Sequence, residues 1–224
     1  MKALATGCVC ALAAATNASA QTQVRYSSFD VGDTFNVGAS YSINGDDPGG
    51  LFTARFDQGF TFTVDGDGFQ LDSIEIAGRW LTGANSFNFS LYTAEPNGAF
   101  PVSQLEPGDL LETITIGGFS DGNIGLDTEI REGFSSVNTP LVDGETYYLV
   151  AETTDAAGEF LWSQSTLPDF ADRETRAFRQ SDTAPWLLFD NNLTAAFRVN
   201  GVIPAPGTAA LLGLGGLTAA RRRR

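Results

Sequence analysis

Hydrophobic and polar residues alternate along short stretches that cover most of the chain. In GFTFTV, the side chains of Phe60, Phe62 and Val64 would share one face of an extended strand. LDSIEIAGRW (71–80) and NSFNFSLYT (85–93) repeat this alternation. A period of two residues places one face of a strand in a core and the other in water, as in antiparallel sheets. The same pattern recurs in LLETITIGG, ETYYLVAETT, EFLWSQS, PWLLFD and AAFRVNG.

These runs predict an all-β fold. Gly, Asp, Asn and Pro separate them, and no stretch of the body sustains the 3.6-residue period of an amphipathic helix. Eight or more strands over roughly 170 residues indicate two packed antiparallel sheets, hence a jelly-roll-like β-sandwich, with a barrel as the main alternative. The 17 phenylalanines would fill its core, because a phenyl ring needs no polar partner. No linker or internal repeat divides the body, so we expect one domain over 21–201, with an exposed loop at 40–50.

The first 20 residues, MKALATGCVCALAAATNASA, predict a secretory signal peptide. Lys2 precedes an apolar run, and the small residues Ala18 and Ala20 suit cleavage by signal peptidase after Ala20. The run is too short to span a membrane, and an ordinary amphipathic helix would need a polar face that it lacks. Both cysteines, Cys8 and Cys10, fall inside this signal helix, and too little apolar sequence precedes Cys8 for a lipoprotein signal. The exported chain would therefore contain no disulfide and no thiol.

The last residues, VIPAPGTAALLGLGGLTAARRRR (202–224), predict a separate segment. Pro204 and Pro206 cannot donate ladder hydrogen bonds, so β pairing would end before them. The 14 uncharged residues that follow would form a helix of about 21 Å, shorter than a hydrocarbon core of about 30 Å. The four terminal arginines resist translocation. We expect transient membrane insertion of this short hydrophobic helix; the alternative, a helix of the core, would need a polar face.

These parts together resemble the PEP-CTERM sorting signal of exopolysaccharide-producing bacteria, which combines a Pro-Glu-Pro-like motif, a Leu- and Gly-rich span and an arginine cluster. The corresponding residues are Pro204, Ala205 and Pro206 for the motif, 211–217 for the span, and Arg221, Arg222, Arg223 and Arg224 for the cluster. Ala205 departs from the family's usual Glu. The resemblance implies processing near the Pro-Ala-Pro by an exosortase, a membrane protease-transpeptidase, followed by release or attachment at the cell surface.

The body is similar to the choice-of-anchor domains that often precede such signals. DGETYYLV (143–150) carries most of this likeness. The resemblance implies a β-sandwich surface module of unassigned activity, and it implies no catalytic residues.

The charge of the exported part limits its partners. All 27 acidic residues lie between the two predicted processing sites, with eight arginines and no lysine, which leaves a net charge near −19 (8 − 27). Such a surface repels nucleic acid and anionic lipid and attracts cations. It would equally keep a protein soluble without any partner.

The missing residue types exclude several kinds of catalysis. The chain has no histidine, and its exported part has no cysteine or lysine. Ser-His-Asp and Cys-His catalysis, His-ligated zinc and lysine Schiff bases are therefore excluded. Paired carboxylates remain, as in glycosidases. Glu129 and Glu132 are the nearest pair, but a strand would place them on opposite faces.

Two kinds of binding site have candidate residues. DGNIGLDTE offers oxygen ligands for structural Ca²⁺ at Asp121, Asn123, Asp127 and Glu129, although Asp and Asn also occur in ordinary turns. Asp46 with Asp47, and Asp65 with Asp67, are weaker pairs. Carbohydrate binding needs exposed aromatic rings, for which the candidates are Trp80, Trp162 and Trp186, each of which could instead fill the core.

Arginine clusters once in this acidic chain, in FADRETRAFRQ. Arg173, Arg176 and Arg179 could contact an anionic polysaccharide or pair with the neighbouring Asp172 and Glu174, and we favour the second interpretation.

The sequence therefore predicts an exported, non-enzymatic protein of the cell surface, outer envelope or extracellular matrix. Signal peptidase and an exosortase would process it, and its role would be structural or adhesive in the envelope or exopolysaccharide. A carbohydrate-binding module that uses exposed tryptophans is the alternative, and a carboxylate-dependent glycosidase is the least favoured one. We expect no cofactor beyond the Ca²⁺ considered above.

Overall fold

A computed structural model describes residues 21–46, 54–66, 68–96, 105–121, 127–167, 175–181, 183–190 and 193–203. The chain divides into two units, and the unit Gln21–Pro204 contains all of these residues. The predicted signal helix, the Pro-Ala-Pro motif, the short hydrophobic helix and the arginine cluster lie outside the described residues.

Strands are the regular elements of this unit. Their bounds are β1 Thr22–Ser27, β2 Asn36–Asn44, β3 Asp57–Thr63, β4 Phe69–Thr82, β5 Ser86–Pro96, β6 Leu105–Gly117, β7 Glu129–Phe134, β8 Pro140–Leu141, β9 Thr146–Thr153, β10 Glu159–Gln164, β11 Thr175–Arg179, β12 Leu187–Asp190 and β13 Phe197–Val202. In this part of the chain no helix is long and apolar enough to cross a membrane.

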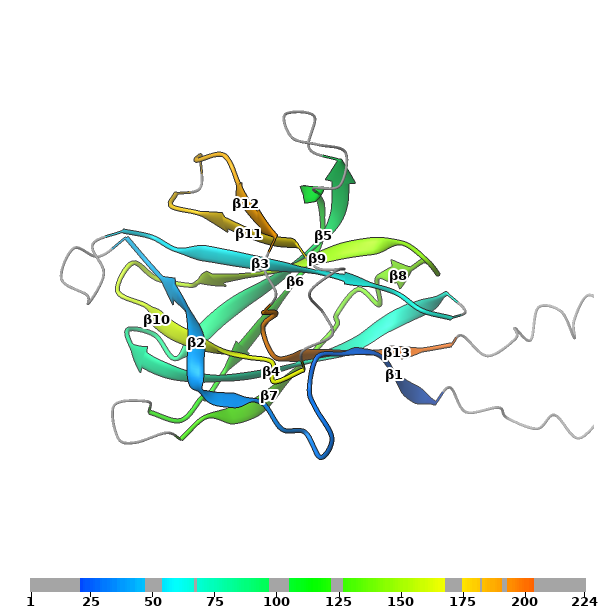
Figure 1. Cartoon of the computed structure of the whole chain (residues 1–224), viewed down its shortest axis with the longest axis horizontal. Helices are drawn as coiled ribbons and strands as arrows, with labels where there is room; N and C mark the ends of the chain where they lie inside the picture. The colour runs from blue at the N-terminus through cyan, green and yellow to red at the C-terminus, as the bar shows by residue number, and fades with distance from the viewer. Residues whose placement is uncertain are drawn as a thin grey trace, which may run out of the picture. The chain divides into compact units, whose positions relative to one another are not determined.

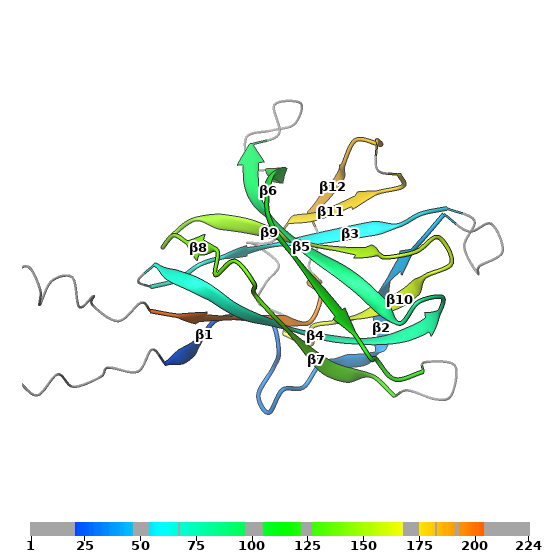
Figure 2. The same ribbon diagram turned by 180° about the vertical axis from the view of Figure 1, so that it is seen from behind.

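The strands form two sheets that pack face to face (Figures 1 and 2). The first sheet has the order β1-β13-β4-β10-β2, and β7 and β8 also pair with β4. The second sheet has the order β12-β11-β3-β9-β5-β6. The paired strands are antiparallel, as in β1 with β13, β3 with β9 and β5 with β6. The prediction of an all-β fold with two antiparallel sheets is confirmed.

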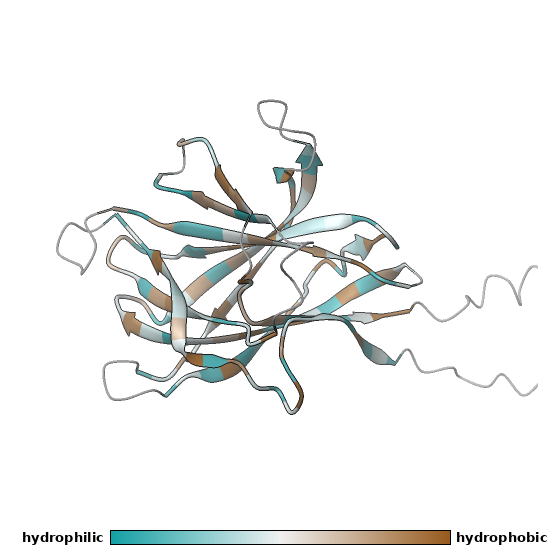
Figure 3. Ribbon diagram, in the orientation of Figure 1, coloured by the Kyte–Doolittle hydropathy of each residue, from teal (hydrophilic) through white to brown (hydrophobic). Residues whose placement is uncertain are grey.

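Aromatic rings from both sheets fill the space between them. Phe60 and Phe62 of β3 are 1% exposed, and Phe87 and Phe89 of β5 are fully buried, as their alternation predicts. Trp162 of β10 lies at the centre, with its ring edge-on to Phe60 at 5.2 Å and to Phe89 at 5.5 Å between centroids. Hydrophobic and hydrophilic residues alternate along the strands in Figure 3.

The predicted exposed loop at 40–50 is wrong in its first half. Residues 40–44 belong to β2, where Tyr41 is 6% exposed and Ile43 is fully buried. SYSIN is itself a period-two run, whose apolar side chains Tyr41 and Ile43 join the core, while Ser40 and Ser42 between them are half-buried. The turn-forming residues GDDPGG (45–50) directly after this run made the whole stretch resemble a loop. Residues 47–50 lie outside the described part.

A buried carboxylate fixes the loop between β7 and β8. Glu112 of β6 is 5% exposed and accepts hydrogen bonds from the hydroxyls of Ser135 and Thr139 and from the backbone N–H groups of Ser136 and Val137. Burial raises the pKa of Glu112, but these four donors outweigh burial, so the net shift is downward. The ionised carboxylate therefore joins the edge of one sheet to a loop of the other.

We predict that Glu112→Gln lowers the free energy of unfolding by about 1–3 kcal/mol at pH 7, because donors that served a carboxylate lose their charged acceptor. A carboxyl whose pKa is lowered on folding stabilises the protein above its unfolded pKa of about 4.3 and loses that contribution as the pH falls through the folded value. The difference between wild type and variant should therefore shrink below pH 4.3 or so. Urea denaturation at pH 7 and pH 3 measures it, with exposed Glu145→Gln as control; equal effects of the two substitutions would contradict the assignment.

Candidate functional site

The structure separates the three candidate tryptophans. Trp162 is fully buried, and its indole N–H donates to the carbonyl of Ala196 at 3.1 Å, so it presents no face to a sugar. Trp80 packs partly against the main core, and its N–H donates to the carbonyl of Thr82 at 2.8 Å. Trp186 lies elsewhere, on the outer face of the second sheet.

A small hydrophobic cluster covers this outer face. Tyr148, Val150 and Ala177 are its buried members, and Trp186 and Leu188 are among the side chains that pack against them. These residues alternate with core residues along β9 and β11, so the second sheet has an apolar centre on both faces. Part of the face that alternation assigns to water is therefore occupied by aromatic and aliphatic side chains.

A network of two carboxylates and two guanidinium groups lies beside this cluster. Asp57 of β3 has a fully buried carboxylate, which accepts from Arg55 Nε at 2.9 Å and from Arg179 Nε at 2.7 Å. Arg179 Nη2 also contacts Glu152 Oε1 at 2.5 Å. Each buried charge has an opposite partner, which offsets the cost of removing it from water.

Aromatic residues frame the network. The Arg179 guanidinium lies 4.5 Å from the ring centroid of Trp186, a cation–π contact. Burial raises the pKa of the Tyr92 phenol, and the negative charge of Glu152 raises it further. Tyr92 therefore stays a neutral hydroxyl that can donate and accept hydrogen bonds.

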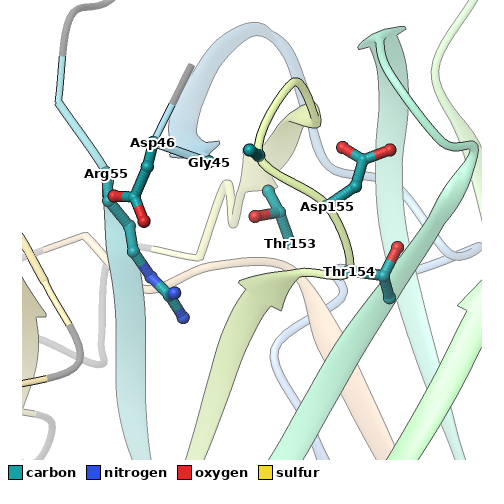
Figure 4. Close-up of a pocket in the computed structure, with 7 residues that line it drawn as sticks. Gly45, Asp46, Arg55, Thr153, Thr154 and Asp155 are labelled. Atoms are coloured by element: carbon teal, nitrogen blue, oxygen red, sulfur yellow. The ribbon is translucent and has the colours of Figure 1, made fainter. Parts of the chain in front are cut away.

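A polar pocket of about 200 Å³ adjoins the network through Arg55. It lies where β2 ends, β3 begins and the β9–β10 turn passes between the sheets. Figure 4 shows Asp46 and Arg55 along one wall and Thr153 and Asp155 along the other. The Asp155 carboxylate accepts from the backbone N–H of Ala84 at 2.7 Å, so this residue also fixes the β4–β5 turn.

One arginine of the predicted cluster pairs with acidic residues that lie outside FADRETRAFRQ. Arg173, Asp172 and Glu174 lie outside the described residues, and Arg179 pairs with Asp57 and Glu152, which are distant in sequence. The sequence around Asp57 and Glu152 did not indicate that they pair with an arginine, because 27 acidic residues are scattered along the chain. Only the register of β3, β9 and β11 brings these partners together.

The predicted calcium ligands are only partly described. Glu129 accepts from the backbone N–H of Ser120 at 2.5 Å and from Arg131 at 2.8 Å, so both its oxygens have protein donors. Asp121 and Asp127 are exposed, and Asn123 lies outside the described residues. Across the described ranges, no three acidic, histidine or cysteine side chains gather as a metal site would require.

Glu129 and Glu132, the nearest carboxylate pair in the sequence, both lie in β7. Glu132 accepts from the Ser73 hydroxyl at 2.6 Å, whereas Glu129 pairs with Arg131. Their spacing of three residues along a strand points the two carboxylates to opposite faces. This geometry does not supply the facing acid and base of a glycosidase.

We predict that Asp57→Asn destabilises the fold by about 3 kcal/mol, because two guanidinium groups would then face each other across an uncharged amide. Urea denaturation followed by far-UV circular dichroism measures the change, with the exposed Asp127→Asn as a control that removes the same charge. Equal midpoints for the two variants would show that the network contributes little to stability.

Comparison with known proteins adds no relative: no family model, curated protein or solved structure matches this chain. What the site can do therefore follows from its own side chains. The site consists of three parts: carboxylates and guanidinium groups that neutralise one another, aromatic rings beside them, and a polar pocket at the end of the sandwich.

Proposed function

We propose that the chain is an exported, non-enzymatic protein of the cell surface or extracellular matrix, with a structural or adhesive role. An exosortase-type enzyme would process its C-terminal segment near Pro204, Ala205 and Pro206, after signal peptidase has removed residues 1–20. Release and covalent attachment at the surface are the two outcomes of such processing.

The position of the first and last strands supports this proposal. β1 begins at Thr22 and β13 ends at Val202, and these two residues face each other as antiparallel partners. Cleavage after Ala20 and near Pro206 would therefore remove no described strand and no core residue. A domain whose two ends leave neighbouring strands of one sheet can lose both segments without losing its packing.

The charges of the outer face support a structural role. Asp57, Glu152, Arg55 and Arg179 neutralise one another and join the ends of three strands. Catalytic carboxylates instead need room for a substrate between them. A self-paired network of this kind stabilises a domain that must last outside the cell without a disulfide.

The topology supports the finer assignment of the sandwich as jelly-roll-like. Most neighbours within a sheet, such as β13 and β4 or β3 and β9, are far apart in sequence. Connections that cross between the two sheets produce this order, as in Greek-key sandwiches.

The proposal predicts the mass of the mature protein. Protein recovered from the host's membrane and medium fractions should lack residues 1–20 and should end near Pro206, with or without an added group. Replacement of Arg221, Arg222, Arg223 and Arg224 by Gln should leave the C-terminal segment uncut, because the charges that retain it on the cytoplasmic side are gone. A wild-type mass that retains GTAALLGLGGLTAARRRR would contradict sorting and make the segment a lasting anchor.

Carbohydrate binding is the second candidate function, and the placement of Trp186 favours it. Trp186 is the candidate tryptophan on an outer sheet face, close to a phenol and to fixed polar groups on β3, β9 and β11. A sugar ring can pack its C–H face on an indole while hydroxyl and charged side chains bind its hydroxyls.

We predict that the host's exopolysaccharide produces a saturable change in tryptophan fluorescence. Trp186→Ala should abolish the binding, Trp186→Phe should retain part of it because a ring remains, and Trp80→Phe should leave it unchanged. If the fluorescence of the wild-type protein does not change during the titration, the carbohydrate-binding proposal is wrong. If Trp186→Ala binds as the wild type does, the binding site does not include Trp186.

A further inference from the structure

Arg176 of β11 is a half-buried cation held by neutral groups. Its Nε donates to Gln58 Oε1 at 2.8 Å, and its guanidinium lies 4.6 Å from the ring centroid of Tyr41 and 5.5 Å from that of Phe189. Burial lowers the pKa of Arg176, which the nearby Tyr41 phenol partly offsets. Within the described ranges, no carboxylate pairs with this guanidinium.

Four other described arginines have carboxylate partners, whereas Arg25 shares the situation of Arg176: it lies 5.3 Å from the ring centroid of Phe69, and its Nε and Nη2 are buried without a hydrogen-bond partner. Arg55, Arg131, Arg179 and Arg198 each contact a carboxylate, at 2.9, 2.8, 2.7 and 2.8 Å respectively. The chain contains 27 acidic residues against 13 basic ones, so acidic partners are abundant. A partly desolvated guanidinium gains most from an anion that binds its planar fork of N–H donors.

Exposed apolar side chains lie next to this cation. Arg176 is paired in register with Phe189, and the next alternate pair is Phe178 with Leu187. Phe189 is 44% exposed and Leu187 is 49% exposed, so both present apolar surface to solvent beside the cation. The β11–β12 hairpin that carries them projects from the sandwich in Figure 1, and Figure 3 shows hydrophobic residues along β12.

We infer that Arg176, Leu187 and Phe189 form a binding surface, here called the Arg176 surface, for a carboxylate-bearing sugar unit of an acidic polysaccharide. The carboxylate would bind the Arg176 guanidinium, and the C–H face of the same ring would pack on Phe189. Trp186 and the compensated Arg179 belong to the opposite face of the hairpin, so this surface is separate from the candidate site described above.

A sugar acid fits the Arg176 surface better than an acidic peptide does. The surface combines one cation with flat and aliphatic carbon, which matches a ring that carries a single carboxylate. A bound peptide also needs partners for its backbone N–H and C=O groups. The groups that contact Arg176 itself are the rings of Tyr41 and Phe189 and the amide of Gln58, which is already bonded to Arg176. A peptide could pair only with the edge strand β12 beside them, and the oligo-glutamate titration below tests that alternative.

The net charge of the protein sets the conditions for binding. The exported part carries a net charge near −19 (8 − 27), so its long-range field repels an acidic polymer. At 0.15 M salt, fields beyond about 8 Å are largely screened, and the short-range contact with Arg176 then decides the affinity.

A binding titration tests the inference. The protein is purified from its host and then titrated with uronic-acid oligomers, neutral dextran oligomers and oligo-glutamate. We expect the uronic-acid oligomers to bind and Arg176→Gln to weaken them about tenfold, the loss typical of a charge-assisted hydrogen bond. Arg176→Lys, which keeps the charge but not the planar fork, should fall between. Arg131→Gln, which removes the same charge from the other sheet, should bind as wild type does. Phe189→Leu, which leaves the cation in place, should weaken binding severalfold and decides the case if Arg176→Gln does not fold.

Several results would overturn the inference. Failure of uronic-acid oligomers to bind, or equal losses in Arg176→Gln and Arg131→Gln, would remove the specific role of Arg176. Equal binding of oligo-glutamate would assign the surface to an acidic peptide instead. The inference rests on the proposal that the chain reaches a sugar polymer outside the cell, but separate measurements test the two. A failure of sorting would appear in the intact mass of the protein. A failure of the Trp186 site would appear as no binding of neutral oligomers.

Discussion

The burial of aromatic rings between two sheets is the interaction on which this structure depends. Trp162 lies between Phe60 and Phe89, and its indole N–H reaches the carbonyl of Ala196, so the largest side chain of the core has both packing and a polar partner. Rings from β3, β5, β10 and β13 contact it or one another, which joins strands that are distant in sequence. Because aromatic side chains bury large areas, this core can hold the sandwich without the support of a disulfide.

Buried carboxylates fix a loop and strand ends that the aromatic core does not hold in place. Glu112 binds four donors around the loop between β7 and β8, whereas Asp57 joins two arginines at the ends of β3 and β11. Both carboxylates face away from water and are satisfied by groups from other elements. Arg176 differs from them, since its guanidinium contacts two rings and an amide, and the proposed binding of a sugar acid rests on this contrast.

Much of the fold was predictable because the period of two residues is a local property. The runs that contain Phe60, Phe87 and Trp162 became strands with those side chains in the core. Residues 40–44 were misassigned because the turn-forming residues after them masked a short alternating run. Trp80, Trp162 and Trp186 could not be separated by sequence, since each lies in or beside an alternating run and only the packing shows which ring remains outside the core.

The sequence by itself determined that the body is an antiparallel all-β domain, since alternation decides which side chains of a strand share a face. It also determined which catalytic chemistries lack their residue types, because composition does not depend on folding. The tertiary structure alone decided that Asp57 meets Arg179 and that Arg176 lies between Tyr41 and Phe189. These contacts depend on strand order and register, which arise from the packing of the whole core and leave no trace in the residues around each partner.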